Sequence, residues 1–272
     1  MNKDDIKRSV GFAAVDRYLE DARHIGLGSG STAIWAVRRL GEVYQQNPAS
    51  AAGGRETGGA ASGGGTSGGG EPSGPASDGG NAAGRPRSFL FVAASTQSLM
   101  EARALGLPVR EMDDPQIGGR LDLVIDGADE VDSDRAVIKG GGGALLREKI
   151  LGYNADRVVL IVDESKLSKN LCERFPVPVE FVPGSQSAVF RALSSLGGRP
   201  ELRTAEKKNG LVVTDNGNYI ADVSFDPPID AAHLEIAINS IPGVVENGLF
   251  TMIDPVVLVG KEDGSVEEFG GN

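Results

Sequence analysis

Two stretches of this sequence concentrate side chains that can move protons and stabilise negative charge. The first, Asp126-Gly-Ala-Asp-Glu130, follows the short apolar run 121–125. The second places Lys139 before the glycine run 140–143 and Glu148 just after it. Carboxylates and an amine can act together as acid, base and electrostatic partner for an oxygen that becomes negative. The two stretches therefore predict an acid/base site.

A second glycine-rich turn, Gly28-Ser-Gly-Ser-Thr32, opens a predicted helix. Such a turn presents backbone N–H groups and the positive end of the helix dipole, here beside three hydroxyls, and it indicates a phosphate site. No Gly-Lys-Ser/Thr ending follows, and a glycine-rich stretch stands where a ribose-binding acid is expected, which argues against a nucleotide. A small phosphorylated ligand fits better, and a strand-to-helix turn without a ligand is the alternative.

A single ligand could join the two features. The carboxylates would repel a phosphate, so the ligand would place its phosphate at the 28–32 turn and extend an uncharged, hydroxyl-rich end toward the acids. Lys139 and Lys166 could stabilise an oxygen that becomes negative, and Glu148 could move a proton between adjacent carbons. These are the requirements of aldose–ketose isomerisation of a sugar phosphate through an enediolate.

Some of these residues also have a simpler interpretation. Arg147-Glu148-Lys149 could be a charged face of a helix and nothing more. Asp126 and Asp129 carry more weight, because carboxylates at the end of a buried strand need partners that satisfy them. Lys166 also follows a buried strand, so we expect it at the same edge of the sheet.

Strand and helix patterns alternate around these motifs and predict a parallel α/β sheet. Each predicted strand is a short apolar run. These strands cover 24–27, 89–93, 121–125, 157–162 and 255–259. The predicted helices cover 3–21, 33–45, 96–105 and 144–153. Ligands of open α/β sheets bind beyond the carboxyl ends of the strands, which is where the motifs lie.

From about residue 172 the pattern changes to that of a smaller α+β domain. Its predicted strands cover 177–182, 201–205 and 219–225, and its predicted helices cover 186–196 and 231–240. The closing apolar run is expected to return to the first sheet. We therefore predict a first domain at 1–171, completed by 247–272, and a second domain at 172–246.

The segment 47–87 is rich in glycine, serine, alanine and proline and has almost nothing large and apolar to bury. Such a segment cannot offset its own ordering entropy. It also lacks lysine and aromatic residues that a ligand would need. We predict a disordered surface insertion in the first domain, around which the fold is built.

Composition excludes several classes of function. The net charge is −11, and the sequence has no visible basic patch. Both observations argue against nucleic acid as a partner. No apolar run reaches the roughly 20 residues that span a bilayer, and the start lacks a signal-peptide core, so we expect a cytoplasmic protein with no membrane partner. His24, His233 and the single Cys172 lack neighbours at metal-ligand spacing, so no metal is predicted. The same acidity would also suit a halophilic source.

Several motifs in one order resemble the ribose-5-phosphate isomerase family of the A type. The resemblance covers nearly the whole chain apart from the insertion. The motifs are Gly28-Ser-Gly-Ser-Thr-Ala33, Asp126-Gly-Ala-Asp-Glu130, Lys139-Gly-Gly-Gly142 with Arg147-Glu-Lys149, Asp163-Glu-Ser-Lys166, Phe175-Pro-Val-Pro-Val-Glu180 and Thr214-Asp-Asn-Gly-Asn218.

The resemblance implies interconversion of D-ribose 5-phosphate and D-ribulose 5-phosphate in the pentose phosphate pathway, without a cofactor. It also implies a Rossmann-like domain with a smaller α+β domain, in a homodimer or homotetramer. By resemblance, Glu148 is the general base, while Asp126 and Lys139 assist ring opening and stabilise the enediolate. The implied substrate-binding residues are Gly28, Ser29, Gly30, Ser31, Thr32, Asp126, Gly127, Ala128, Asp129, Lys139, Gly140, Gly141, Gly142 and Lys166.

Two alternatives come from other classes of protein. A related sugar-phosphate deaminase would be expected to have a catalytic histidine near its acid, but neither His24 nor His233 lies in these motifs. A non-enzymatic sugar-phosphate sensor that regulates transcription would need a DNA-binding segment. None is expected, because the predicted first helix begins close to the start of the sequence.

Overall fold

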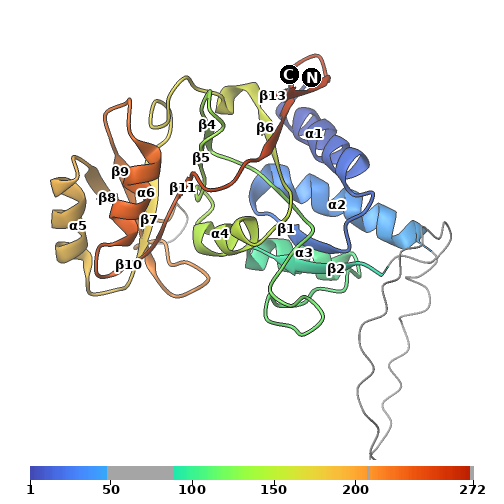
Figure 1. The fold of residues 1–272 in the computed structure, drawn as a ribbon, viewed down its shortest axis with the longest axis horizontal. Coiled ribbons are helices and arrows are strands. Elements are labelled where there is room, and N and C mark those ends of the chain that lie inside the picture. Colours follow the sequence, from blue (N-terminus) through green and yellow to red (C-terminus); the bar gives the residue numbers. More distant parts are fainter. Residues whose placement is uncertain (48–87, 207–208, 270–272) are drawn as a thin grey trace, which may run out of the picture.

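The computed structural model describes residues 1–47, 88–206 and 209–269 (Figure 1). The predicted insertion at 47–87 lies outside these residues, apart from Asn47. The helices are α1 (Lys3–Tyr18), α2 (Gly30–Gln46), α3 (Thr96–Ala104), α4 (Leu145–Tyr153), α5 (Gln186–Ser195) and α6 (Ala231–Asn239), and a 3-10 turn covers Glu164–Lys166. The strands are β1 (His24–Leu27), β2 (Leu90–Ala93), β3 (Leu123–Asp126), β4 (Glu130–Val131), β5 (Val137–Ile138), β6 (Val158–Asp163), β7 (Val177–Phe181), β8 (Arg199–Leu202), β9 (Tyr219–Ser224), β10 (Val244–Asn247), β11 (Leu249–Phe250), β12 (Val256–Gly260) and β13 (Val266–Phe269).

The main sheet has the strand order β13-β12-β6-β3-β1-β2. Its strands are parallel except for β13, which runs antiparallel to β12. Successive residues of β6 face opposite sides: Val159 and Ile161 pack in the core that contains α1 and α2, whereas Leu160 and Val162 pack in the core that contains Leu151 of α4. Burial on both faces is typical of parallel sheets and explains the apolar runs of the sequence. The predicted parallel α/β sheet is confirmed.

The second sheet, which we call the small sheet, has the order β10-β7-β9-β8 and is antiparallel. α5 and α6 contribute Val189, Leu193, Leu234 and Ile238 to its core. In Figure 1 it lies on the left, and the short strands β4 and β5 lie between it and the main sheet. The predicted α+β part is therefore present, while the domain boundaries at 171/172 and 246/247 stay a prediction.

Most predicted elements agree with the structure to within a few residues. The segment 255–259 returns to the main sheet as β12 beside β6, as predicted. α2 begins at Gly30, not at residue 33, because the second half of the glycine turn already forms the first helical turn. β4, β5 and β11 were not predicted, since strands of two residues are too short to show an alternating pattern. β10 and β13 were not predicted either.

The strand order places the loops that carry the motifs at one point. From β1 the chain crosses to β2 on one side, while β3 lies on the other side of β1. Such a reversal leaves a crevice at the carboxyl ends of the two central strands. The loops at 28–32 and 127–129 follow β1 and β3, and both therefore open into this crevice.

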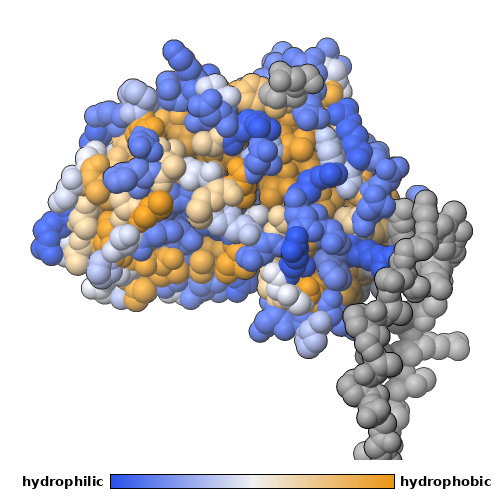
Figure 2. Space-filling view, viewed as in Figure 1, coloured by the Kyte–Doolittle hydropathy of each residue, from blue (hydrophilic) through white to orange (hydrophobic). Residues whose placement is uncertain are grey.

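Figure 2 shows that hydrophilic residues cover much of the visible surface, with smaller hydrophobic areas between them. This distribution agrees with the strongly negative net charge of −11. None of the helices in the described part of the chain is long and apolar enough to cross a membrane.

Candidate active site

The first loop of the site joins β1 to α2. The Gly28 N–H donates to the carbonyl of Ile125 at 3.0 Å, which ties the turn to β3. A Cβ on Gly28 would lie 2.2 Å from Oδ1 of Asp126, so only glycine allows this close approach. Gly30 has a φ of +88°, which glycine adopts without strain. α2 starts here, so the positive end of its dipole lies at the cavity wall.

Asp126 ends β3 and lies behind the cavity, with 2% of its surface exposed. Its Oδ1 accepts hydrogen bonds from the backbone N–H groups of Ser29 at 2.9 Å and Gly127 at 2.7 Å. Its Oδ2 lies 2.9 Å from Nζ of Lys139. One carboxylate therefore holds together the 28–32 turn, the loop after β3 and Lys139.

Lys139 follows β5 and is also buried. Its Nζ donates to the carbonyl of Gly127 and lies 3.4 Å from Oε1 of Glu148. Burial lowers the pKa of Lys139, but the carboxylates of Asp126 and Glu148 outweigh burial and raise this pKa above its ordinary value. The amine is therefore charged and sits between two carboxylates.

Glu148 lies in the first turn of α4, which begins after the glycine run, and is 6% exposed. Burial raises the pKa of Glu148 to about 8, Lys139 opposes this shift, and the charges of Asp126 and Asp129 add to it. Its Oε1 faces Lys139, whereas its Oε2 has no hydrogen-bond partner among the residues that the structure describes. A carboxylate in this state can take up a proton near neutral pH.

The alternative of a merely charged helix face is wrong for two of the three residues that suggested it. Glu148 and Lys149 are both buried. Nζ of Lys149 lies 2.9 Å from Oε1 of Glu235 and 2.8 Å from Oε1 of Glu246. These ion pairs hold α4 against α6 and β10, and thereby set the position of Glu148.

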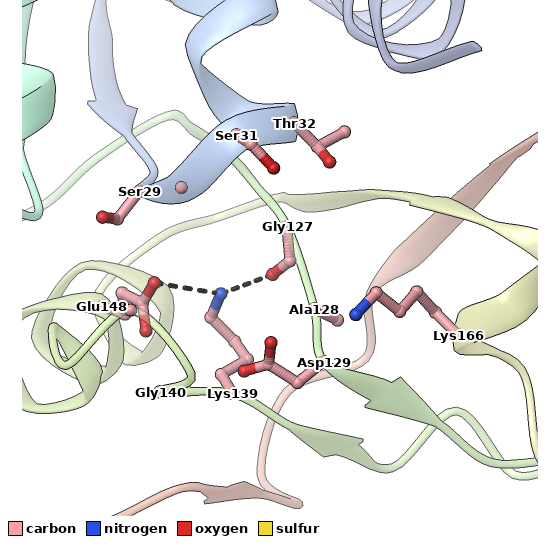
Figure 3. Close-up of a pocket in the computed structure, with 12 residues that line it drawn as sticks. Ser29, Ser31, Thr32, Gly127, Ala128, Asp129, Lys139, Gly140, Glu148 and Lys166 are labelled. Atoms are coloured by element: carbon pink, nitrogen blue, oxygen red, sulfur yellow. Dashed lines mark hydrogen bonds and ion pairs between the residues drawn. The ribbon is translucent and has the colours of Figure 1, made fainter. Parts of the chain in front are cut away.

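These groups surround one cavity (Figure 3). The turn at the start of α2 lies on one side, and Asp129, Lys139 and Glu148 lie across from it. Lys166 points toward the cavity from the segment after β6. The lining residues are Ser29, Gly30, Ser31, Thr32, Gly127, Ala128, Asp129, Lys139, Gly140, Gly142, Glu148 and Lys166.

Three predicted site residues lie next to the cavity without lining it. Gly28 and Asp126 lie behind its wall, where they contact each other. The Gly141 N–H points at Asp129 and donates to its Oδ2 at 2.7 Å. The structure thus brings the predicted residues together, while their individual roles stay predictions.

Lys7 was missed by sequence reasoning. It lies on α1, and its Nζ donates to the hydroxyl of Ser31 at 2.9 Å. This contact adds a cation to the 28–32 turn. No local signal marks this lysine, because it resembles any exposed charge on an amphipathic helix. Among the described residues, no group of three or more His, Cys, Asp or Glu side chains is placed to hold a metal ion.

Comparisons with known proteins agree with this geometry. Residues 90–264 match the family model of ribose 5-phosphate isomerase A, or phosphoriboisomerase A. The ribose-5-phosphate isomerase A of Thermosynechococcus vestitus is 41% identical over 256 residues, which cover 94% of this chain and 91% of that protein. The same enzyme of Pyrococcus furiosus is 36% identical over 264 residues, 97% of each chain.

Solved structures give the same result. Ribose 5-phosphate isomerase A from Methanocaldococcus jannaschii superposes with a TM-score of 0.77 at 36% identity, covering 98% of this chain and 100% of that one. A D-ribose-5-phosphate isomerase in complex with phospho-erythronic acid gives a TM-score of 0.79 at 34% identity, covering 98% and 99%. The resemblance seen in the motifs is confirmed, and the chain belongs to the ribose 5-phosphate isomerase A family.

Proposed function

We propose that this site interconverts D-ribose 5-phosphate and D-ribulose 5-phosphate with Glu148 as the general base. One observation carries the assignment: Oε2 of Glu148 is buried and without a partner among the described residues, and its side chain lines the same cavity as the 28–32 turn. A base and an anion-binding turn at opposite walls suit a short phosphorylated sugar. Purified protein should form ketose from ribose 5-phosphate, and no ketose between about pH 6 and 9 would contradict the proposal.

Starting from the open-chain aldose, Glu148 removes the proton from C2 and the electron pair moves toward the C1 carbonyl, so that O1 becomes negative. Lys139, which is charged and lines the cavity, stabilises this enediolate oxygen. Glu148 then returns its proton to C1 while the proton on O2 passes to O1, which leaves the C2 ketone. Asp126 contributes through Lys139, to which it is paired.

The phosphate of the substrate would lie at the start of α2, where Ser31 and Thr32 line the cavity and Lys7 lies beside Ser31. Asp129 and Lys166 would contact the sugar from the other walls. The relative solved with phospho-erythronic acid supports this arrangement, because its ligand carries both a phosphate and a carboxylate. A carboxylate resembles an enediolate in its distribution of negative charge.

Thr32→Ala tests the phosphate end. It should raise the KM for ribose 5-phosphate more than it lowers kcat, because phosphate contacts hold the ground state and the transition state alike. Inorganic phosphate should compete with substrate in the wild type and compete more weakly in the variant. Thr32→Ser keeps the hydroxyl and is the matched control. Phosphate that fails to compete even at high concentration would count against this placement.

The pH dependence of kcat/KM tests the base. A base accepts a proton only when ionised, so kcat/KM should rise with pH through the pKa of Glu148, about 8, and level off above it. The phosphate of the substrate titrates near pH 6 and gives a separate rise of kcat/KM at lower pH. Steady-state rates between about pH 6 and 10 would show both limbs, and a flat profile above about pH 7 would contradict the raised pKa.

Family membership also supports a wider setting. We propose that the enzyme acts in the non-oxidative pentose phosphate pathway, in the cytoplasm, as a homodimer or homotetramer, without a nucleic-acid or membrane partner. The acidic composition, with 38 Asp and Glu against 27 Lys and Arg, supports the proposal that nucleic acid is not a partner. Light scattering on the purified protein would measure its oligomeric state.

A further inference from the structure

We propose that Arg203, from the small sheet, is a positioning residue for the glycine run of the site. Arg203 directly follows β8, and its Nη1 donates to the carbonyls of Gly140 at 2.7 Å and Gly141 at 3.1 Å. Gly140 lines the cavity. A side chain far along the chain, in a different sheet, therefore binds the backbone of the candidate active site. The inference rests on the proposed function, since it concerns the geometry of the same site.

Asp222 on β9 fixes the direction of this arginine. Nε of Arg203 donates to Oδ2 of Asp222 at 2.9 Å, and Nη2 donates to Oδ1. The side chains are 12% and 27% exposed, respectively. A two-point contact holds the guanidinium plane in one orientation, so Nη1 is aimed at the two carbonyls. Because Asp222 balances the charge of Arg203, we expect the effect on the site to be one of geometry.

The glycine run needs such support because it has no side chains of its own. Gly140 and Gly143 have φ values of +104° and +79°, and glycine loses more conformational freedom on ordering than any other residue. Hydrogen bonds to its peptide groups are the directional contacts that can orient such a backbone. The Gly143 N–H donates to the carbonyl of Gly140 at 2.9 Å, which closes a turn but does not anchor it to the rest of the site.

Two of the anchoring contacts meet at a single peptide group. The carbonyl of Gly140 and the N–H of Gly141 belong to the same planar unit. Arg203 donates to the oxygen of this peptide, the carbonyl of Gly140. The N–H of the same peptide, that of Gly141, donates to Oδ2 of Asp129 at 2.7 Å. Asp129 lines the cavity. Arg203 therefore orients Asp129 through one rigid peptide.

The same run connects Lys139 to α4, which carries Glu148. A shift of the run would change the position of Asp129 and the separation between the amine and the base. Misplacement of catalytic groups by about 1 Å can cost about 100-fold in rate. Among the described residues, the Arg203 side chain donates to Asp222, Gly140 and Gly141, and none of its hydrogen bonds goes to the 28–32 turn.

The test uses Arg203→Ala and Arg203→Lys in the full chain. We expect kcat on ribose 5-phosphate to fall by about 10- to 100-fold in Arg203→Ala and by about tenfold in Arg203→Lys, because lysine keeps the charge and lacks the two-point contact. The inhibition constant of inorganic phosphate should stay within about twofold, because the phosphate end is untouched. A general loss of folded protein would not separate these two quantities.

The chain offers a control in a second arginine–aspartate pair near β8 and β9. Arg199 of β8 makes a two-point contact with Asp226 through Nη2 and Nη1, at 2.9 and 3.2 Å, and these side chains are 60% and 83% exposed. In the described part of the chain, no hydrogen bond joins this pair to the glycine run. Arg199→Ala should therefore leave kcat within about threefold of wild type.

The inference is overturned if Arg203→Ala keeps more than about a third of wild-type kcat, or if Arg199→Ala loses as much as Arg203→Ala. Should Arg203→Ala fail to fold, Arg203→Lys decides by the same comparison at a temperature below its Tm. A wild-type protein inactive on ribose 5-phosphate contradicts the proposed function and this inference together. An active wild type with unaffected Arg203 variants contradicts this inference alone.

Discussion

Glu148→Gln should lower turnover on ribose 5-phosphate by roughly 10²- to 10⁴-fold and change substrate binding little. The amide keeps the shape of the side chain but cannot take up the carbon-bound proton. Lys139 keeps its contact with Asp126 at 2.9 Å, so the wall of the cavity should stay in place. Steady-state kinetics measure kcat, and the phosphate inhibition constant reports on binding.

Proton exchange separates this role from ring opening. The wild type should exchange the C2 proton of ribose 5-phosphate with deuterium from solvent, and Glu148→Gln should not. Glu111→Gln, at an exposed position away from the cavity, controls for the loss of one carboxylate. If Glu148→Gln retains more than about a tenth of wild-type turnover, the base is another group, and Asp129 is the next carboxylate that lines the cavity.

Lys139→Met should have the second-largest effect, because it acts on stability as well as on rate. The substitution leaves Asp126 and Glu148, which are 2% and 6% exposed, without the cation that contacts both. Removal of one partner from a buried ion pair costs about 3–5 kcal/mol of the free energy of unfolding. Turnover should also fall by at least about 100-fold, since the enediolate oxygen loses its positive partner.

The pH dependence of this loss has a defined sign. Without the amine, which lowers the pKa of Glu148, this pKa rises further above about 8. The loss relative to wild type should therefore grow as the pH rises through about 8, where Glu148 ionises in the wild type but less readily in the variant, as measured by urea unfolding at about pH 7 and pH 9. Lys166→Met, at the cavity wall, is the control and should leave the unfolding free energy within about 1 kcal/mol of wild type. Wild-type stability of Lys139→Met near pH 8 would contradict the prediction.

Local sequence patterns predicted the strands of the main sheet because the strands are buried on both faces. Runs such as those of β6 and β12 must be continuously apolar when Val159 and Leu160 pack into different cores. The same reasoning predicted that Asp126, at the end of β3, lies at the ligand-binding edge. Strands β4, β5 and β11 escaped prediction, since each has two residues and depends on a neighbour for its hydrogen bonds.

The residue types and their order in the sequence by themselves determined the family and the main parts of the site. A glycine turn before a helix, acids after a strand, and a lysine and a glutamate around a glycine run each follow from local backbone requirements. Such requirements are written in neighbouring residues, so they are readable without a fold. Ser31, Asp129, Lys139 and Glu148 accordingly line the cavity, as their motifs suggested.

Only the tertiary structure decided which groups lie behind the cavity lining and contact it. Asp126 lies beneath the cavity, Lys149 is buried between two glutamates, and Lys7 and Arg203 reach the site from elements far away in sequence. Each of these positions depends on how sheets and helices pack, and an arginine or lysine looks the same in a sequence whether it faces solvent or a backbone carbonyl. The raised pKa of Glu148 has the same origin, because its burial and its closeness to the charges of Asp126 and Asp129 arise only once the chain has folded.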